Sequence, residues 1–117
     1  MFKIHPIENY EVAKSIYSTL KEDELLFGVN EEGHFTGFGV SCIINDAIFI
    51  RRIEANAPDA RFLLFADMLN YADRRGLKKA VCEDKSLKDI CDRMGFNNDL
   101  AVNLEGFFKP GAHCSHE

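Results

Sequence analysis

The residues best suited to chemistry in this 117-residue chain are scattered, and the densest group lies near the C-terminus. His113, Cys114 and His116 have the side chains of metal ligands, but they supply three ligands at most, and structural zinc sites use four. Pro110 precedes them, as is common in loose tails. We therefore expect a flexible tail over residues 109–117 and no metal site.

Two other side chains have the chemistry of proton transfer. Glu54 ends an apolar run, and a carboxylate there can accept a proton from an amine substrate; the alternative is a plain surface charge. Cys91 has a thiol, whose ordinary pKa of about 8.5 allows it to act as an acid. The alternative for Cys91 is a core residue, because it falls on an apolar helical stripe.

Charge and composition exclude several classes of protein. The formal net charge is −5, which argues against a nucleic-acid binder or a binder of acidic membranes. No apolar run approaches the roughly 20 residues that span a bilayer. The four cysteines form no C-x-x-C pair, and the first residues lack a signal-peptide pattern, so we expect a cytoplasmic protein with reduced thiols.

A basic cluster has a simple physical explanation. It follows a predicted helix and comprises Arg74, Arg75, Lys78 and Lys79. Cations are favourable near a helix C-terminus because of the helix dipole. Binding of an anionic ligand is the alternative.

Apolar periodicity predicts the elements that position these residues. Alternating patterns indicate strands over residues 2–7, 25–29, 35–44, 47–54 and 79–83, and one or two more up to residue 108. Patterns with helical spacing indicate helices over residues 9–20, 59–75 and 86–94.

The first helix and the hairpin carry the clearest local signals. Asn9 is placed to cap the helix. Val12, Ile16 and Leu20 recur every four residues, with Ala13 and Tyr17 beside them, as one apolar stripe. Residues 31–33 indicate a hairpin loop of several residues between two strands.

The third strand of the meander leads into the most apolar helix. Simple alternation places Ile48, Ile50 and Arg52 on one face of that strand. Asn56 is the expected N-cap, with Asp59 three residues on as in a capping box. Apolar residues cover more than half of the circumference of the helix, so we expect it to be buried against a sheet.

The predicted order is β-α-β-β-β-α-β-α-β, which defines an α/β fold. The sheet is mixed and mostly antiparallel, with helices on both faces. One right-handed crossover makes the strands at 47–54 and 79–83 parallel, and the sheet should splay after the strand that ends near Glu54. Residues 1–108 form one domain.

Three segments in this order resemble the GNAT superfamily, which has the acyl-CoA N-acyltransferase fold. They are the hairpin at 27–40, the helix end and following strand at 69–81, and the segment at 87–96, which ends in Met94-Gly95-Phe96. The resemblance implies transfer of an acyl group from acyl-CoA to an amine. It places acyl-CoA between the splayed central strands and implies no covalent enzyme intermediate.

The segment that would bind the CoA pyrophosphate departs from the family pattern R/Q-x-x-G-x-G/A. It has no glycine, and the residues at the cofactor-binding positions are Asn56, Ala57, Ala60 and Arg61. Pro58 has no N–H to donate, and the charge of Asp59 repels a phosphate. We therefore expect acetyl-CoA to bind weakly, at about millimolar concentration or above, which corresponds to only about −4 kcal/mol.

The tyrosine that serves as general acid in many family members is also missing. In the resembling segment Cys91 takes its position. Two functions stay open: an N-acetyltransferase, or a non-catalytic module on this fold that binds a small ligand or a protein. The expected partners are a small-molecule amine or a protein, with a homodimer as a further option.

Overall fold

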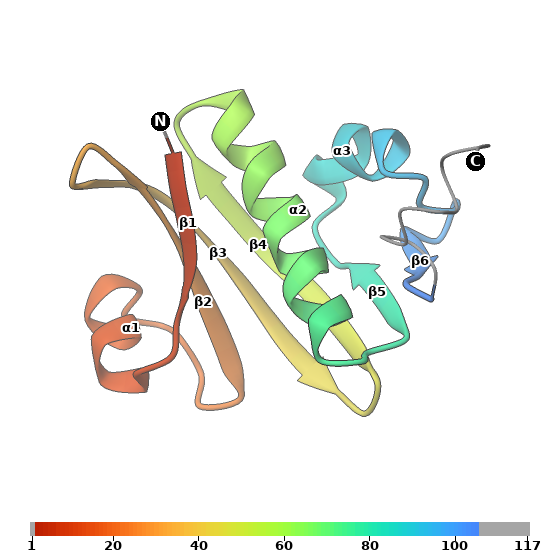
Figure 1. Cartoon of the computed structure of the whole chain (residues 1–117), viewed down its shortest axis with the longest axis horizontal. Helices are drawn as coiled ribbons and strands as arrows, with labels where there is room; N and C mark the ends of the chain where they lie inside the picture. The colour runs from red at the N-terminus through yellow and green to blue at the C-terminus, as the bar shows by residue number, and fades with distance from the viewer. Residues whose placement is uncertain (1, 106–117) are drawn as a thin grey trace.

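The computed structural model describes residues 2–105, and its elements follow the predicted order (Figure 1). The strands are β1 (Phe2–Ile7), β2 (Glu24–Glu31), β3 (His34–Ile44), β4 (Ala47–Ala55), β5 (Lys79–Cys82) and β6 (Ala101–Asn103). The helices are α1 (Tyr10–Ile16), α2 (Pro58–Arg74) and α3 (Lys88–Arg93), and a short 3₁₀ turn, Lys85–Leu87, precedes α3.

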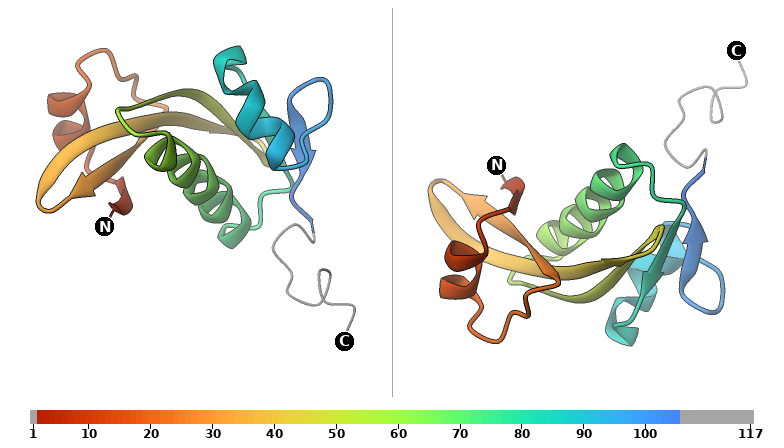
Figure 2. Two further views of the ribbon diagram at one scale, coloured as in Figure 1. Left: turned by 90° about the horizontal axis from the view of Figure 1, so that it is seen from above. Right: turned by 90° about the horizontal axis from the view of Figure 1, so that it is seen from below.

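The six strands form one sheet in the order β1-β2-β3-β4-β5-β6. All neighbours are antiparallel except β4 and β5, which are parallel where Ala47–Ile50 pairs with Lys79–Cys82. Helix α2 covers one face of the sheet, and α1 and α3 lie on the other (Figure 2). The predicted mixed sheet with helices on both faces is confirmed, and so is its single parallel pair.

Helix α2 supplies most of the core. Its buried residues are Ala60, Leu64, Phe65, Met68, Leu69 and Ala72. They pack against inward-facing residues of the sheet, among them Phe27, Val29, Ile48 and Ile50. Gly39 of β3 lies directly under the helix, because an added Cβ there would come within 2.3 Å of the Met68 Cε atom.

The predicted cap of α2 is wrong. The N-cap is Ala57, which makes no side-chain cap hydrogen bond, and the Arg61 N–H donates to the Ala57 carbonyl at 3.1 Å. Pro58 therefore occupies the first helical position, where a missing N–H costs no helical hydrogen bond. This preference of proline moves the helix start one residue beyond Asn56.

Helix α1 is shorter than predicted, and one residue of its predicted apolar stripe faces outward. Asn9 is the cap, and its side chain accepts from the Val12 N–H at 3.1 Å. Ala13, Ile16, Tyr17 and Leu20 of the predicted stripe pack in one cluster, and Val12, at 49% exposed, is the member that faces outward. A small residue at the contact allows α1 to lie close to Leu26 of β2, and Leu20 packs there from the loop after the helix.

Two irregularities change the predicted strands. The hairpin loop is the two-residue turn Glu32–Gly33, in which both residues have positive φ, and it is shorter than predicted. In β4 the pairing with β3 skips Arg51, which makes that residue a β-bulge. The bulge shifts the alternation by one residue, so Ile53, and not Arg52, shares the core with Ile48 and Ile50.

Candidate functional site

The sheet opens between β4 and β5. Their pairing ends at Ile50 and Cys82, with a last hydrogen bond of 2.8 Å from the Glu83 N–H to the Ile50 carbonyl. Strand β4 continues to Ala55, paired with β3 alone among the strands of residues 2–105. Residues 51–55 therefore present a free sheet edge. The opening thus lies after β4, the strand that ends near Glu54, as predicted.

Arg51 is held at the start of the opening by two carboxylates, Glu24 at the start of β2 and Glu83 just after β5. Its Nη1 lies 3.0 Å from Glu24 Oε2, and its Nε lies 3.2 Å from Glu83 Oε1. The Glu24 side chain is only 8% exposed, and its hydrogen bond raises the pKa of the Arg51 guanidinium. Arg51 therefore stays charged and ties β2, β4 and β5 together.

A groove of about 500 Å³ lies at the C-terminal end of β4, and we call it the Glu54 groove. Its apolar walls come from Ile16, Phe35 and Phe38, and its polar lining includes Thr36, Glu54, Asn56 and Arg61. The structure thus brings together three of the residues singled out from the sequence, Glu54, Asn56 and Arg61. The Glu54 carboxylate forms an ion pair with Arg52, and both side chains are about half exposed.

The aromatic lining of this groove was missed from the sequence. Phe35 and Phe38 belong to a hairpin whose alternation predicts only a strand. Gly28 of β2 makes room for the Phe35 ring, because a Cβ at this glycine would lie 2.6 Å from the Phe35 Cε1 atom. A glycine facing an aromatic residue across a hairpin is the one signal that could have indicated the site.

The start of α2 provides a second surface beside the opening. The N–H groups of Asp59 and Ala60 lie in the first turn, where no helical carbonyl can accept from them. A hollow of about 280 Å³ is lined there by Pro58, Asp59, Phe62, Leu63 and Arg93. Ala60 is 1% exposed, so only its backbone is available to a ligand. Arg61 lines the Glu54 groove instead, on a different side of the helix start.

Cys91 lies inside the core at 0% exposure. Burial, and then the nearby Cys82 thiol, raise the pKa of Cys91 to about 12. A thiol with so high a pKa is a poor acid toward a leaving thiolate, whose ordinary pKa is about 8.5. The position favours the interpretation of Cys91 as a core residue, and its role as general acid stays a prediction.

The raised pKa of Cys91 predicts a pH effect on stability. The folded chain keeps this proton up to about pH 12, whereas the unfolded chain releases it near the ordinary value of 9.0. The stability contributed by the neutral thiol is therefore complete below about pH 9 and falls as the pH rises toward 12. The difference in free energy of unfolding between the wild type and Cys91→Ala, measured by urea titration, should shrink over this range. A constant difference would contradict the assignment.

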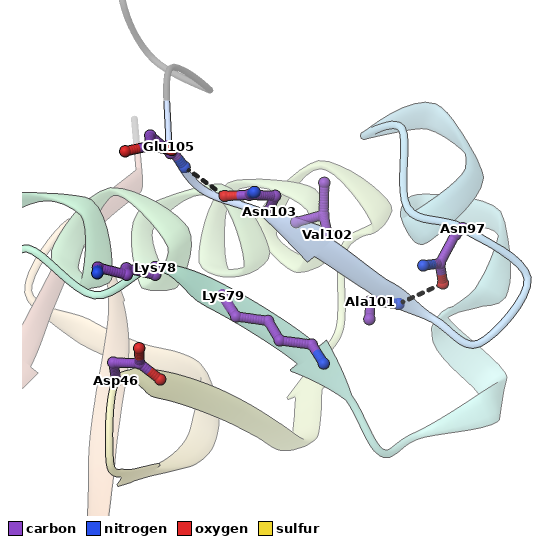
Figure 3. A pocket seen from close by; sticks show the side chains of 8 residues that line it. All are labelled: Asp46, Lys78, Lys79, Asn97, Ala101, Val102, Asn103 and Glu105. Carbon is purple, nitrogen blue, oxygen red and sulfur yellow. Dashed lines mark hydrogen bonds between the residues drawn. The ribbon is translucent and has the colours of Figure 1, made fainter.

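The basic cluster lies away from the opening. Lys78 and Lys79 border a hollow of about 410 Å³ beside β6, together with Asp46, Asn97 and Asn103 (Figure 3). In Figure 3, Lys79 extends along β5, and the Asn97 side chain accepts from the Ala101 N–H at 3.1 Å. This is the end where β4 and β5 are still paired, so these lysines do not border the free edge of β4.

Metal and membrane features can be described for residues 2–105 only. Within this range no group of histidine, cysteine and carboxylate side chains is arranged to hold a metal ion. The predicted tail with His113, Cys114 and His116 lies outside the described residues. None of the helices in the same range is both long and apolar enough to cross a bilayer.

Comparison with known proteins gives a match in structure alone. No family model and no curated protein sequence matches the chain. The ribosomal-protein-S18-alanine N-acetyltransferase of Escherichia coli matches with a TM-score of 0.62 at 18% identity, over 83% of this chain and 78% of that chain. A GNAT family acetyltransferase of Elizabethkingia anophelis with acetyl-CoA bound matches with a TM-score of 0.65 at 15% identity, over 82% of this chain and 76% of that chain.

A further similar structure also contains the coenzyme. The PaiA N-acetyltransferase of Thermoplasma acidophilum, in complex with coenzyme A, gives a TM-score of 0.57 at 15% identity. It is matched over 74% of this chain and 58% of that chain. These similarities show that the chain has the GNAT fold, the acyl-CoA N-acyltransferase fold, as the sequence resemblance predicted.

Proposed function

We propose that this protein binds acyl-CoA at the free edge of β4 and transfers the acyl group to an amine in the Glu54 groove. The observation that carries the proposal is the adjacency of the two features. Residues 51–55 form the unpaired edge, and Glu54 belongs both to that edge and to the groove. A donor on the edge and an acceptor in the groove would meet at one strand. The neighbours with bound acetyl-CoA or coenzyme A support the choice of donor.

The free edge of β4 suits the pantetheine arm of the coenzyme. This arm is extended and carries two amides, and an extended chain can pair with the open N–H and C=O groups of a sheet edge. The start of α2 suits the diphosphate less well. Its free N–H groups attract an anion, but Asp59 sits among them and Pro58 contributes no donor. The β4 edge and the start of α2 therefore fit acyl-CoA, with weak affinity.

Glu54 is placed to accept a proton from the amine substrate. Bound acyl-CoA supplies an electrophilic thioester carbonyl, which only a neutral amine can attack. The Glu54 carboxylate lines the groove and can take the proton from an ammonium group held there. Its ion pair with Arg52 orients this carboxylate.

Titration calorimetry with acetyl-CoA tests the weak donor site. We expect a dissociation constant of about 1 mM or more, because the glycine-mediated contacts to the diphosphate are absent. Asp59→Asn removes one repulsive charge at the helix start and should lower that constant about 2- to 5-fold, from a helix-terminus effect of about 0.3–1 kcal/mol. Asp73→Asn, near the other end of α2, removes the same charge and should leave binding unchanged. Equal effects of the two variants would contradict the site.

A non-catalytic ligand-binding module on the same fold is the second candidate. The burial of Cys91 favours it, because no acid for the leaving thiolate is then supplied from this position. An assay of acetyl transfer to a panel of primary amines at saturating acetyl-CoA, with products detected by mass spectrometry, distinguishes the transferase from the module. A product that depends on the protein supports the transferase. Micromolar binding of acetyl-CoA would also argue against the module. If the protein neither bound acetyl-CoA nor formed a product, the module would remain as the function.

A further inference from the structure

The lining of the Glu54 groove has two charged side chains, the carboxylate of Glu54 and the guanidinium of Arg61. Glu54 is already paired with Arg52, while Arg61 lines the same groove from the first turns of α2. The ion pairs found among residues 2–105 do not include Arg61. Arg61 is therefore the charged residue of the groove lining that has no ion-pair partner in the described part of the chain. A guanidinium in this setting is suited to a carboxylate, which it can bind with two parallel hydrogen bonds.

The wall opposite these charges is apolar and partly uncovered. Phe35 is 50% exposed even though its ring packs over Gly28. The ring of Phe38 packs in a tilted arrangement against that of Tyr17, with 4.9 Å between the ring centroids, next to Ile16 at the end of α1. Large aromatic side chains left open beside a concave surface are typical of sites that bury an apolar ligand group.

A polar atom in the same lining lacks a partner. Thr36 Oγ1 is buried and has no hydrogen-bond partner among residues 2–105. A buried hydroxyl without a partner is costly, and a ligand atom in the groove can satisfy it. The groove thus offers a carboxylate, a guanidinium, a free hydroxyl and an aromatic wall within one space of about 500 Å³.

We propose that the Glu54 groove binds a free α-amino acid with an apolar side chain. Arg61 binds the α-carboxylate, Glu54 binds the α-ammonium group, and the side chain packs on Phe35 and Phe38. Thr36 donates to the carboxylate. The inference rests on the proposed function only in naming the acceptor, since the binding itself needs no acyl-CoA. An amine without a carboxylate would leave the charge of Arg61 unbalanced.

The test is a titration of the full chain with L-phenylalanine, followed by NMR in the absence of any CoA. Three analogues each remove one feature: 2-phenylethylamine has no carboxylate, 3-phenylpropionate has no ammonium group, and glycine has no apolar side chain. We expect L-phenylalanine to bind at least 10-fold more tightly than each of them. Equal affinity for 2-phenylethylamine would overturn the proposal.

Charge variants assign the two polar contacts. Arg61→Gln should weaken L-phenylalanine and 3-phenylpropionate at least 5-fold and leave 2-phenylethylamine unchanged, whereas Glu54→Gln should weaken L-phenylalanine and 2-phenylethylamine. Arg74→Gln, on an exposed turn of the same helix, is the matched control and should change nothing. Equal effects of Arg61→Gln and Arg74→Gln would overturn the assignment.

The outcomes for binding and for transfer are separable. Tight amino-acid binding without acyl transfer would refute the proposed transferase and support the Glu54 groove as an amino-acid site. Acyl transfer that is insensitive to Arg61→Gln and prefers 2-phenylethylamine would keep the transferase and refute the amino-acid site.

Discussion

Glu54→Gln is expected to lower the rate of acyl transfer by about 10²- to 10⁴-fold, the usual contribution of a positioned general base. The substitution keeps the size of the side chain and removes its ability to accept the ammonium proton. Steady-state kinetics at saturating amine measure the loss. Glu11→Gln, an exposed residue of α1, removes the same charge and should keep the wild-type rate.

A pH profile separates a base from a structural residue. Without Glu54, only the amine that is already neutral in solution can react, so the variant should recover part of its rate as the pH rises toward the pKa of the amine. The wild type should gain less over the same range. If Glu54→Gln lowered the rate equally at all pH values, or lowered the melting temperature, Glu54 would be a structural residue that orients Arg52.

Phe65→Ala is expected to lower the free energy of unfolding by about 3–5 kcal/mol, the cost of removing a buried aromatic side chain and leaving a cavity. Phe65 is 0% exposed on α2, and the centroid of its ring lies 5.3 Å from that of Phe96, three residues beyond the end of α3. Urea unfolding followed by circular dichroism measures the loss. The total free energy of unfolding of such a domain is about 5–15 kcal/mol, so the variant should be close to unfolding.

A neighbour of Phe65 on α2 is the matched control. Leu63 is 41% exposed, so Leu63→Ala should change the free energy of unfolding by about 0.5 kcal/mol or less. A loss as large as that of Phe65→Ala would mean that the outer side of α2 is covered in solution. A small loss for Phe65→Ala would contradict the packing of α2 against the region of α3.

The sequence alone determined the order of the elements and the layered arrangement. Periodicities of two and of about 3.6 residues are local, so the strands, the long apolar helix and the parallel crossover were predictable from spacing. Asn9 caps α1, as its residue type predicts. Glu54 was singled out as a carboxylate at the end of a predicted strand, and Asn56 and Arg61 as cofactor-binding positions implied by the resemblance to the GNAT superfamily. The structure then places all three along one groove.

The tertiary structure decided what local patterns cannot express. The bulge at Arg51 depends on pairing with β3, so simple alternation assigned Arg52 to the wrong face. The exposure of Val12 and the burial of Ala13 follow from how closely α1 can approach β2. Cys91 acquired its raised pKa only through burial beside Cys82. The aromatic wall of the groove, the unpaired Thr36 hydroxyl and the free edge of β4 arise where segments distant in sequence meet. Their chemistry is set by contacts across the fold, which residue type and spacing alone do not specify.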